Sequence, residues 1–348
     1  MTDRPALDVV IVNWNGGALL RACLASLAAG RDAASVQVTV VDNASTDGST
    51  EDLPALPRPL RLIRNAENLG FGLACNQGAA AGDAPAILFL NPDTQVAADA
   101  LGLARAALTA DSRTGIVGAR LVDPDGRTAR SCARAPSARG LLGRALALDR
   151  LGLVRPHFLL DWDHEEDRAV DQVMGAFLMI RRDLFAALDG FDPRFFVYWE
   201  DVDLCARARA AGFSVRHVAG AAARHEGQGT TRQVRARRLF YFLRSQILYA
   251  GKHHGAAAAL ALTAASFGAQ VPLRLVLALA RRSTGRSTGH SPGHATGRST
   301  GEAAEVLRAA ALLAAALPDL LPGLLQGRLS RRLSRRLPGR PGASRTRR

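Results

Sequence analysis

Residues 88–94 read LFLNPDT, and this stretch decides the fold. The apolar run at 87–90 is typical of a strand buried on both faces, and Pro92 fixes a turn between Asn91 and Asp93. Such a strand delivers both polar side chains to its carboxyl end, where oxygen ligands hold Mg²⁺ or Mn²⁺. A plain Asn-Pro turn that ends the strand is the alternative, and it is the preferred interpretation of the motif taken alone.

Short β-branched runs alternate with Ala- and Leu-rich stretches through the first 120 residues. The runs predict strands at residues 7–12, 36–41, 60–64 and 87–91. The stretches between them predict helices at residues 18–29, 70–81 and 97–110. This alternation predicts an α/β fold with a mostly parallel sheet flanked by helices. Asn13, Asp42 and Asn91 follow strands, so we expect them at the carboxyl edge, where such sheets bind ligands.

The following region is less regular. We expect residues 123–170 to form an excursion without clear edges. Order returns at residues 170–180, with helices expected near 183–188, at 200–211 and at 232–253. Residues 213–218 predict a last strand, followed by His225 in a Gly-rich loop.

Three acids open the helix expected at residue 200, within FFVYWEDVDLC at residues 195–205. The helix dipole favours acids in a first turn, which accounts for any single one without a function. Glu200 and Asp201 are adjacent and point in different directions, so one of them is free to act as a base. Aromatic neighbours raise the proton affinity of a carboxylate, as a general base requires.

Two further motifs follow predicted strands. In VVDNASTDGS, residues 40–49, Asp42 is placed to accept hydrogen bonds from a base N–H or a ribose hydroxyl. An Asx-turn with a helix cap is the alternative, and it is the preferred interpretation of Asp47. NAENLGFG, residues 65–72, is a Gly-rich helix start that suits a nucleotide or diphosphate, although such starts are common.

The formal charge of +14 is unevenly distributed along the 348 residues. Residues 1–229 carry 24 Arg and no Lys against 28 Asp and Glu, a net of −4, whereas residues 230–348 carry 20 Arg and one Lys against three acids, a net of +18. The basic character therefore belongs to the C-terminal third, and we expect no nucleic-acid partner for the main domain. Asp3 and Asp8 lie where a secretion signal needs a basic run, which predicts a cytoplasmic body.

The four cysteines are far apart and form no CxxC pair. This spacing argues against a zinc site and against a dense disulfide framework, and it predicts four buried thiols. The residues are Cys23, Cys75, Cys132 and Cys205.

We expect a main domain at residues 1–254 and four segments after it. These are an apolar helical segment at 255–281, a linker of five tetrapeptides at 282–301, an apolar helix at 302–327 interrupted by Pro318 and Pro322, and a disordered Arg-rich tail at 328–348. Residues 256–273 form an uncharged stretch of 18 residues. This length is the lower limit for a helix that crosses a bilayer. Arg residues near an anionic membrane add affinity, so we expect this extension to attach to such a surface. A plain helical extension with a solvated tail is the alternative.

The motifs, in this order, resemble those of the family 2 glycosyltransferases, and most closely the rhamnosyltransferase-like branch. The resemblance covers about residues 7–254. It rests on VVDNASTDGS, NxxNxGFGxxxN, LFLNPDT, MGAFLMIRRDLF, GFDPRFFVYWEDVDLCARARAAG and a late His-Glu-Gly. Any one block is weak, whereas their order and spacing are specific. The resemblance implies a Rossmann-like GT-A fold and inverting transfer from a UDP- or dTDP-sugar, with rhamnose as the family-level expectation.

The resemblance also implies roles for single residues. Asp201 matches the catalytic base, with adjacent Glu200 as its competitor. Asp93 matches a ligand of Mg²⁺ or Mn²⁺, and His225 matches a late histidine that completes this metal site or contacts the diphosphate. Asn91 replaces a frequent first acid, which predicts modest metal affinity. The donor-binding residues would be Asn13, Asp42, Asn68, Gly70, Asn76 and Asn91. The acceptor wall would contain Met174, Gly175 and Trp199.

Three rival functions fit parts of the chain. Nucleic-acid binding suits the Arg-rich tail but leaves the ordered acids unexplained. A nucleotidyltransferase needs a basic, Gly-rich phosphate loop after the first strand, and NWNGG at residues 13–17 offers none. A polyprenyl-phosphate sugar synthase differs only in its acceptor and stays open. The expected acceptor is a cell-envelope glycan or a polyprenyl-diphosphate-linked sugar, used at the inner face of the plasma membrane.

Overall fold

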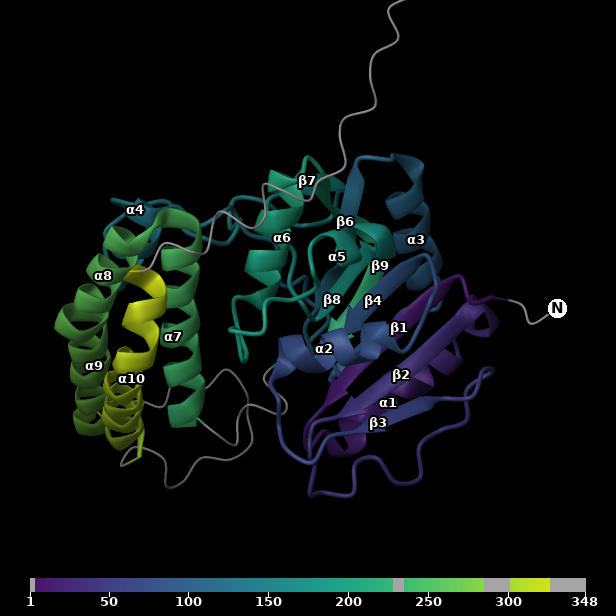
Figure 1. Ribbon diagram of the computed structural model, residues 1–348, viewed down its shortest axis with the longest axis horizontal. Coiled ribbons are helices and arrows are strands. Elements are labelled where there is room, and N and C mark those ends of the chain that lie inside the picture. Colours follow the sequence, from purple (N-terminus) through teal and green to yellow (C-terminus); the bar gives the residue numbers. More distant parts are fainter. Residues whose placement is uncertain (1–3, 228–234, 285–300, 326–348) are drawn as a thin grey trace, which may run out of the picture.

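The computed structural model describes residues 4–227, 235–284 and 301–325. Within these residues nine strands form one sheet in the order β3-β2-β1-β4-β8-β6-β9-β5, with β7 paired to β9 (Figure 1). The strands are β1 (Leu7–Asn13), β2 (Val36–Asp42), β3 (Arg61–Arg64), β4 (Ala86–Leu90), β5 (Thr94–Val96), β6 (Thr114–Val122), β7 (Arg168–Val170), β8 (Phe177–Arg181) and β9 (Ser214–His225). The helices that accompany them are α1 (Gly17–Ala28), α2 (Phe71–Ala80), α3 (Ala100–Ala110), α4 (Ala138–Ala145), α5 (Arg182–Ala187) and α6 (Glu200–Ala210).

The first half of the sheet is parallel, as the sequence predicts. β1 pairs in parallel with both β2 and β4, and β2 pairs in parallel with β3. β8 runs antiparallel to β4 and to β6, so the complete sheet is mixed. The predicted α/β architecture is confirmed, and a further parallel pair, β6 with β9, lies in the second half of the sheet.

The strand β1 separates two hydrophobic cores. Val9 and Ile11 pack in the core that contains α1 and α3, while Val10 and Val12 pack in the core that contains α2, α5 and α6. Because both faces are buried, every residue of β1 is buried and the strand is a continuous apolar run but for Asp8 and Asn13. The four cysteines are buried and free, which confirms the expected thiols.

The strands β6 and β9 differ from the sequence predictions. No strand was expected at Thr114–Val122, and the last strand was expected to end at residue 218. The residues after Val218 read AGAAARH, and Ala and Gly have low strand preference. Pairing with β6 and β5 nevertheless extends β9 to His225. His225 therefore ends a strand, and its expected place inside a Gly-rich loop is wrong.

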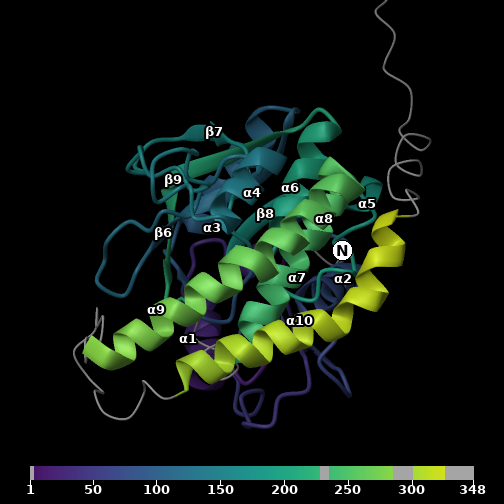
Figure 2. The same ribbon diagram turned by 90° about the vertical axis from the view of Figure 1, so that its left-hand side faces the viewer.

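A helical body packs beside the sheet domain in Figure 1 and lies in front of it in Figure 2. It consists of α7 (Arg235–His254), α8 (Ala256–Ala265), a π-helical turn (Ser266–Gln270), α9 (Val271–Thr284) and α10 (Glu302–Leu325). Leu243, Ile247, Leu262 and Leu313 share its core. The predicted boundary at residue 254 coincides with the turn at Gly255, but α7 packs with α8 and α10. The predicted division into domains stays a prediction.

Three expectations concern the C-terminal segments. The helix α10 continues through Pro318 and Pro322, so the expected interruption is wrong; the buried Leu313 and Leu320 hold it in the shared core. In the part of the chain that the structure describes, one helical stretch, Ala256–Ala280, is long and apolar enough to cross a membrane, by length and composition only. Most of the tetrapeptide linker and the Arg-rich tail lie outside the described residues.

Candidate functional site

The carboxyl ends of β1 and β2 place Asn13 opposite Asp42. Both are buried, and Asn13 Nδ2 donates to Asp42 Oδ1 at 3.1 Å and to Ser49 Oγ at 2.8 Å. Ser45 Oγ also donates to Asp42 Oδ1. These bonds fix the Asp42 carboxylate at the sheet edge. They support a positioning role for Asn13, and a direct contact of either residue with a donor stays a prediction.

Asp47, in the same loop, has the structural role that its motif favoured. Gly17 N, at the start of α1, donates to Asp47 Oδ2 at 3.0 Å. Ser49 N donates to Asp47 Oδ1 at 3.0 Å, which closes an Asx-turn. The carboxylate therefore ties the loop after β2 to the start of α1.

The Gly-rich turn before α2 is held by amide side chains. Asn68 Oδ1 accepts from Gly70 N at 2.9 Å and from Asn43 Nδ2 at 3.2 Å. Gly70 has a φ of 85°, and a Cβ there would lie 2.4 Å from the Phe196 carbonyl oxygen. Only glycine permits this approach, which brings the turn against the segment that precedes α6.

Asn76 connects the same two regions. Its Nδ2 donates to Phe191 O at 2.9 Å, and its Oδ1 accepts from Phe191 N at 2.9 Å. Both ends of the amide are thus bonded to one backbone unit. This geometry supports a joint between α2 and the loop after α5, and the expected contacts of Asn68 and Asn76 with a donor stay predictions.

Asp93 and His225 meet at the carboxyl edge. β5 pairs with β9 so that Thr94 lies opposite His225, and Glu226 N donates to Asp93 O at 3.1 Å. The side-chain atoms Asp93 Oδ1 and His225 Nε2 are 3.3 Å apart, with only 8% and 15% of the side chains exposed. A carboxylate oxygen and an imidazole nitrogen this close suit one divalent cation. In residues 4–227, 235–284 and 301–325, no group of three acidic, His or Cys side chains is arranged to hold a metal.

The segment Gly175–Ala176 connects the turn that carries Asp93 to Asp201 through backbone hydrogen bonds. Asn91 N donates to Ala176 O at 3.1 Å. The preceding residue, Gly175, donates its N–H to Asp201 Oδ2 at 2.9 Å. The predicted acceptor residue and the predicted base are therefore in contact, next to the strand end that carries Asp93.

Glu200 and Asp201 have different surroundings. Asp201 Oδ1 accepts from Val202 N at 2.7 Å, while the buried Oε2 of Glu200 has no hydrogen-bond partner among the residues that the structure describes. Burial, and next the charge of Asp201, raises the pKa of Glu200 well above its usual range. Burial also raises the pKa of Asp201, although the N–H of Gly175 opposes the shift. The charge of Glu200 also acts on Cys75 of α2 and, after burial, helps to raise the pKa of that thiol.

Two consecutive residues before α6 have left-handed backbone conformations. Tyr198 has a φ of 67° and Trp199 a φ of 72°. Such conformations cost energy in bulky residues and persist where the surroundings hold them. The Trp199 ring is stacked on His157, with centroids 6.0 Å apart, and packs against Tyr249 of α7. Trp199 is 5% exposed as a residue, and its place in an acceptor wall stays a prediction.

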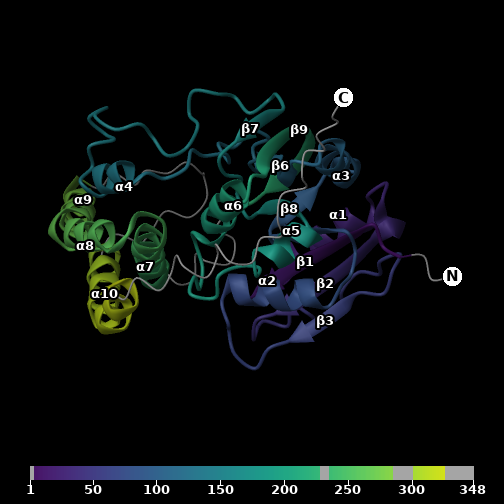
Figure 3. The same ribbon diagram turned by 45° about the horizontal axis from the view of Figure 1, so that its top comes forward.

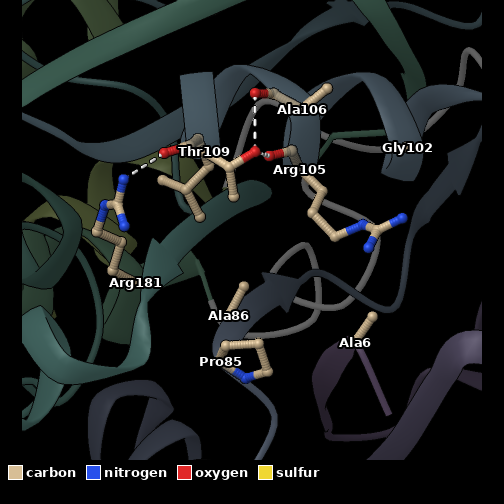
Figure 4. Close-up of a pocket in the computed structure, with 9 residues that line it drawn as sticks. Ala6, Pro85, Ala86, Gly102, Arg105, Ala106, Thr109 and Arg181 are labelled. Carbon is tan, nitrogen blue, oxygen red and sulfur yellow. Dashed lines mark hydrogen bonds between the residues drawn. The ribbon is translucent and has the colours of Figure 1, made fainter. Parts of the chain in front are cut away.

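A cavity of about 400 Å³ lies away from these residues (Figure 4). Pro85 and Ala86, at the start of β4, line it together with residues of α3. It therefore opens at the amino ends of the strands. Arg181, which also lines it, is already bonded to the carbonyls of Leu108, Asp111 and Thr114.

Comparison with known proteins matches this arrangement to one family. The profile of the family described as glycosyl transferase family 2 covers residues 8–188, more than half of the chain. The chain belongs to glycosyltransferase family 2.

Relatives of this glycosyltransferase include rhamnosyltransferases. It is 31% identical over 271 residues to the N-acetylglucosaminyl-diphospho-decaprenol L-rhamnosyltransferase of Mycobacterium tuberculosis, covering 73% of this chain and 87% of that protein. It is 32% identical over 83 residues to the rhamnosyltransferase WbbL of Escherichia coli, covering 24% and 31%. Among solved structures, it resembles the mannosyltransferase PcManGT from Pyrobaculum calidifontis in complex with GDP-Man and Mn²⁺, with a TM-score of 0.49, 18% identity and coverage of 90% and 88%.

The glycosyltransferase also holds a charged cluster that the sequence reasoning missed. Lys252 Nζ, on α7, lies 2.6 Å from Asp192 Oδ2 and 2.7 Å from Asp203 Oδ1. His253 Nε2 and Arg207 Nε also contact Asp203, at 2.8 and 2.7 Å. Burial raises the pKa of Asp203, but the His253 hydrogen bond and the charges of Arg207 and Lys252 outweigh it and hold the pKa at about 2. The sequence feature that could have pointed to this cluster is Lys252, because it is the only lysine in the chain.

Asn43 is a second residue that the sequence reasoning missed. It is 2% exposed, and its side chain bonds Asn65, Asn68 and the Gly70 carbonyl. Its place directly after Asp42 was the only sequence signal.

Proposed function

We propose that the protein transfers a sugar, rhamnose, from a UDP- or dTDP-sugar to a hydroxyl of a polyprenyl-diphosphate-linked acceptor, with inversion at the anomeric carbon. The named M. tuberculosis relative supports the sugar and the acceptor class, because the alignment spans 73% of this chain. The contact of Gly175 N with Asp201 Oδ2, beside the Asp93 turn, is the structural observation that carries the proposal.

Asp201 accepts the proton in the proposed reaction. The acceptor hydroxyl oxygen attacks the anomeric carbon, and its proton passes to a carboxylate oxygen of Asp201. The bond between that carbon and the diphosphate oxygen breaks on the opposite face, and its electron pair leaves with the nucleoside diphosphate. The Gly175 N–H orients Asp201 for this transfer.

Asp93 and His225 would hold the divalent cation, Mg²⁺ or Mn²⁺. Their donor atoms, 3.3 Å apart, fit a cation whose shell the donor phosphates and water complete. When bound, such an ion offsets the charge that develops on the leaving diphosphate. With Asn91 in place of a first acid, Asp93 is the carboxylate that this motif supplies.

The test uses purified protein, dTDP-rhamnose or UDP-sugars, and a short-chain prenyl-diphosphate N-acetylglucosamine. We expect release of nucleoside diphosphate that requires both acceptor and Mg²⁺ or Mn²⁺, and that stops when a chelator removes the ion. NMR of the product should show the anomeric configuration opposite to that of the donor. Retention of configuration, or transfer only to a prenyl monophosphate, would contradict the proposal; the second result would identify a polyprenyl-phosphate sugar synthase.

A further inference from the structure

A second cavity, of about 260 Å³, lies between α4 and the helical body. Figure 3 shows α4 beside α8 and α9, apart from the sheet. Arg144 of α4, Arg150 after it and Arg274 of α9 line the cavity, together with Gln246 and Phe242 of α7. Pockets for whole small molecules usually exceed roughly 300 Å³, so this cavity suits a compact chemical group.

Positive charge in the cavity is only partly compensated. Asp149 and Glu302 also line the cavity, and the charge of Asp149 partly offsets the effect of burial on the pKa of Arg144. Partial burial, followed by the charges of Arg150, Arg144 and the nearby Arg238, lowers the pKa of Arg274. Guanidinium groups that repel one another in this way favour a bound anion, and their planar donors match phosphate oxygens.

Gln246 gives independent evidence for a polar guest. It is 2% exposed and lines the cavity, and its Oε1 has no hydrogen-bond partner among the described residues. A buried amide without a partner is costly, because its desolvation is not offset. The amide orientation is an assignment, and with the NH2 group turned toward the cavity Gln246 donates to an anionic guest.

Exposed apolar side chains lie on both segments that supply the arginines. Leu151 and Leu153, next to Arg150, are 71% and 69% exposed, and Val276, two residues after Arg274, is 60% exposed. Apolar groups around an anion site suit a ligand with a charged head and a hydrocarbon chain.

Aromatic rings connect the cavity to the start of α6. Phe242 lines the cavity, and its ring centroid is 6.0 Å from that of Trp199. The Trp199 ring is also stacked on His157. Burial, and next the charge of Arg144, lowers the pKa of His157 to about 4. Phe242 thus lies next to both the cavity and Trp199, the residue that precedes Glu200 and Asp201.

We propose that this cavity binds the diphosphate of the lipid-linked acceptor, with the adjacent exposed apolar side chains receiving the start of its prenyl chain. The assignment of a sugar-bearing lipid rests on the proposed function, whereas binding of a prenyl diphosphate does not. Arg144 and Arg274 are the principal donors, and Gln246 bonds the remaining oxygen or ester group.

The direct test is titration of the full chain with farnesyl diphosphate, in the absence of donor and metal. Replacing both arginines, Arg144→Gln with Arg274→Gln, should weaken binding roughly tenfold or more, because each loses a charge-assisted hydrogen bond. Arg308→Gln is the matched control, since Arg308 is exposed on α10 of the same body. Equal affinity of the double variant and wild type would overturn the proposal, as would an equal loss in the control.

Two further experiments are needed. The first distinguishes a prenyl diphosphate from a membrane phospholipid as the ligand, and the second distinguishes the cavity proposal from the proposed function. Phosphatidylglycerol vesicles that compete with farnesyl diphosphate as strongly, per exposed lipid, would assign the cavity to membrane lipid and overturn the acceptor. In steady-state assays the double variant should raise KM for the diphosphate-linked acceptor, with little change in kcat and in donor KM. With an acceptor that lacks the diphosphate, variant and wild type should be equal. Arginine-dependent binding without any glycosyl transfer would refute the proposed function alone.

Discussion

Adjacent residues at the start of α6 illustrate how surroundings separate two identical chemical groups. The carboxylate of Asp201 accepts backbone N–H groups from Gly175 and Val202. The carboxyl of Glu200 is buried, and within the described part of the chain its Oε2 lacks a hydrogen-bond partner. A group kept in apolar surroundings tends to hold its proton, whereas hydrogen bonds to the charged form keep a base ready. This contrast favours Asp201 as the base.

We expect Asp201→Asn to lower kcat by roughly a hundredfold to ten thousandfold, the usual contribution of a general base. Donor binding should change little, because Asp201 faces the acceptor residue Gly175. Sugar transfer and donor affinity are the quantities to measure. The matched variant Glu200→Gln keeps a neutral, isosteric group and should lose less than about tenfold.

The pH profile gives a second reading of the same assignment. Burial raises the pKa of Asp201, so activity should fall as pH drops through a value above the ordinary 3.8 of an aspartate. This acid limb should persist in Glu200→Gln. Wild-type turnover by Asp201→Asn, or loss of the limb in Glu200→Gln alone, would transfer the role to Glu200.

At the scale of elements, α7 fastens the segment that leads into α6. Arg244 Nη1 donates to Arg194 O at 2.8 Å, and Ser245 Oγ donates to Val197 O at 3.0 Å. Lys252 adds the ion pairs to Asp192 and Asp203. These contacts surround the two left-handed residues, Tyr198 and Trp199, and so hold a costly backbone in place.

We expect Lys252→Met to lower the free energy of unfolding by about 3 kcal/mol at neutral pH, because it removes the cation that two buried carboxylates share. The folded pKa of Asp203, about 2, is below its ordinary 3.8. The stabilisation is therefore complete above about pH 4 and is lost as pH falls toward 2. Denaturant unfolding of wild type and Lys252→Met between pH 7 and pH 2 measures the difference in their free energies of unfolding, which should shrink as pH falls.

The surface pair Arg209–Asp171 supplies the control, since its side chains are 31% and 44% exposed. Arg209→Gln should cost at most about 1 kcal/mol, as exposed ion pairs do. A Lys252→Met protein as stable as wild type at pH 7 would show that the cluster does not fasten α7.

At the scale of the whole molecule, charge and packing divide the chain differently. Net charge changes sign near residue 230, but the core of α7–α10 is continuous with Phe195, Trp199 and Val202 of the sheet domain. Removing residues 256–348 would therefore expose the buried face of α7, including Leu243 and Ile247. A truncation after residue 325 keeps every described helix.

We expect the full chain to float with phosphatidylglycerol vesicles at low salt, and the chain shortened to residues 1–325 to bind at least tenfold more weakly. Nine arginines lie in residues 328–348, and each adds about 1 kcal/mol near an anionic surface before screening by salt. Flotation with 0.5 M salt and with neutral vesicles are the controls. Equal flotation of both chains would exclude the tail as the membrane anchor. The exposed side of Ala256–Ala280 would then be the remaining anchor.

The sequence by itself determined the strand–helix alternation, the residues at the carboxyl edge and the family. These depend on local apolar periodicity and on motifs whose order is preserved along the chain. It could not determine where each polar side chain points. Asn76 bonds Phe191, 115 residues away, and Lys252 meets Asp192 and Asp203 across two elements.

Only the tertiary structure decided three features: the contact between Asp93 and His225, the different surroundings of Glu200 and Asp201, and the arginine-lined cavity between α4 and the helical body. Each depends on segments far apart in sequence that one packed arrangement brings together. His225 shows the reason most simply: its own neighbours predicted a loop, and pairing of β9 with β5 placed it beside Asp93.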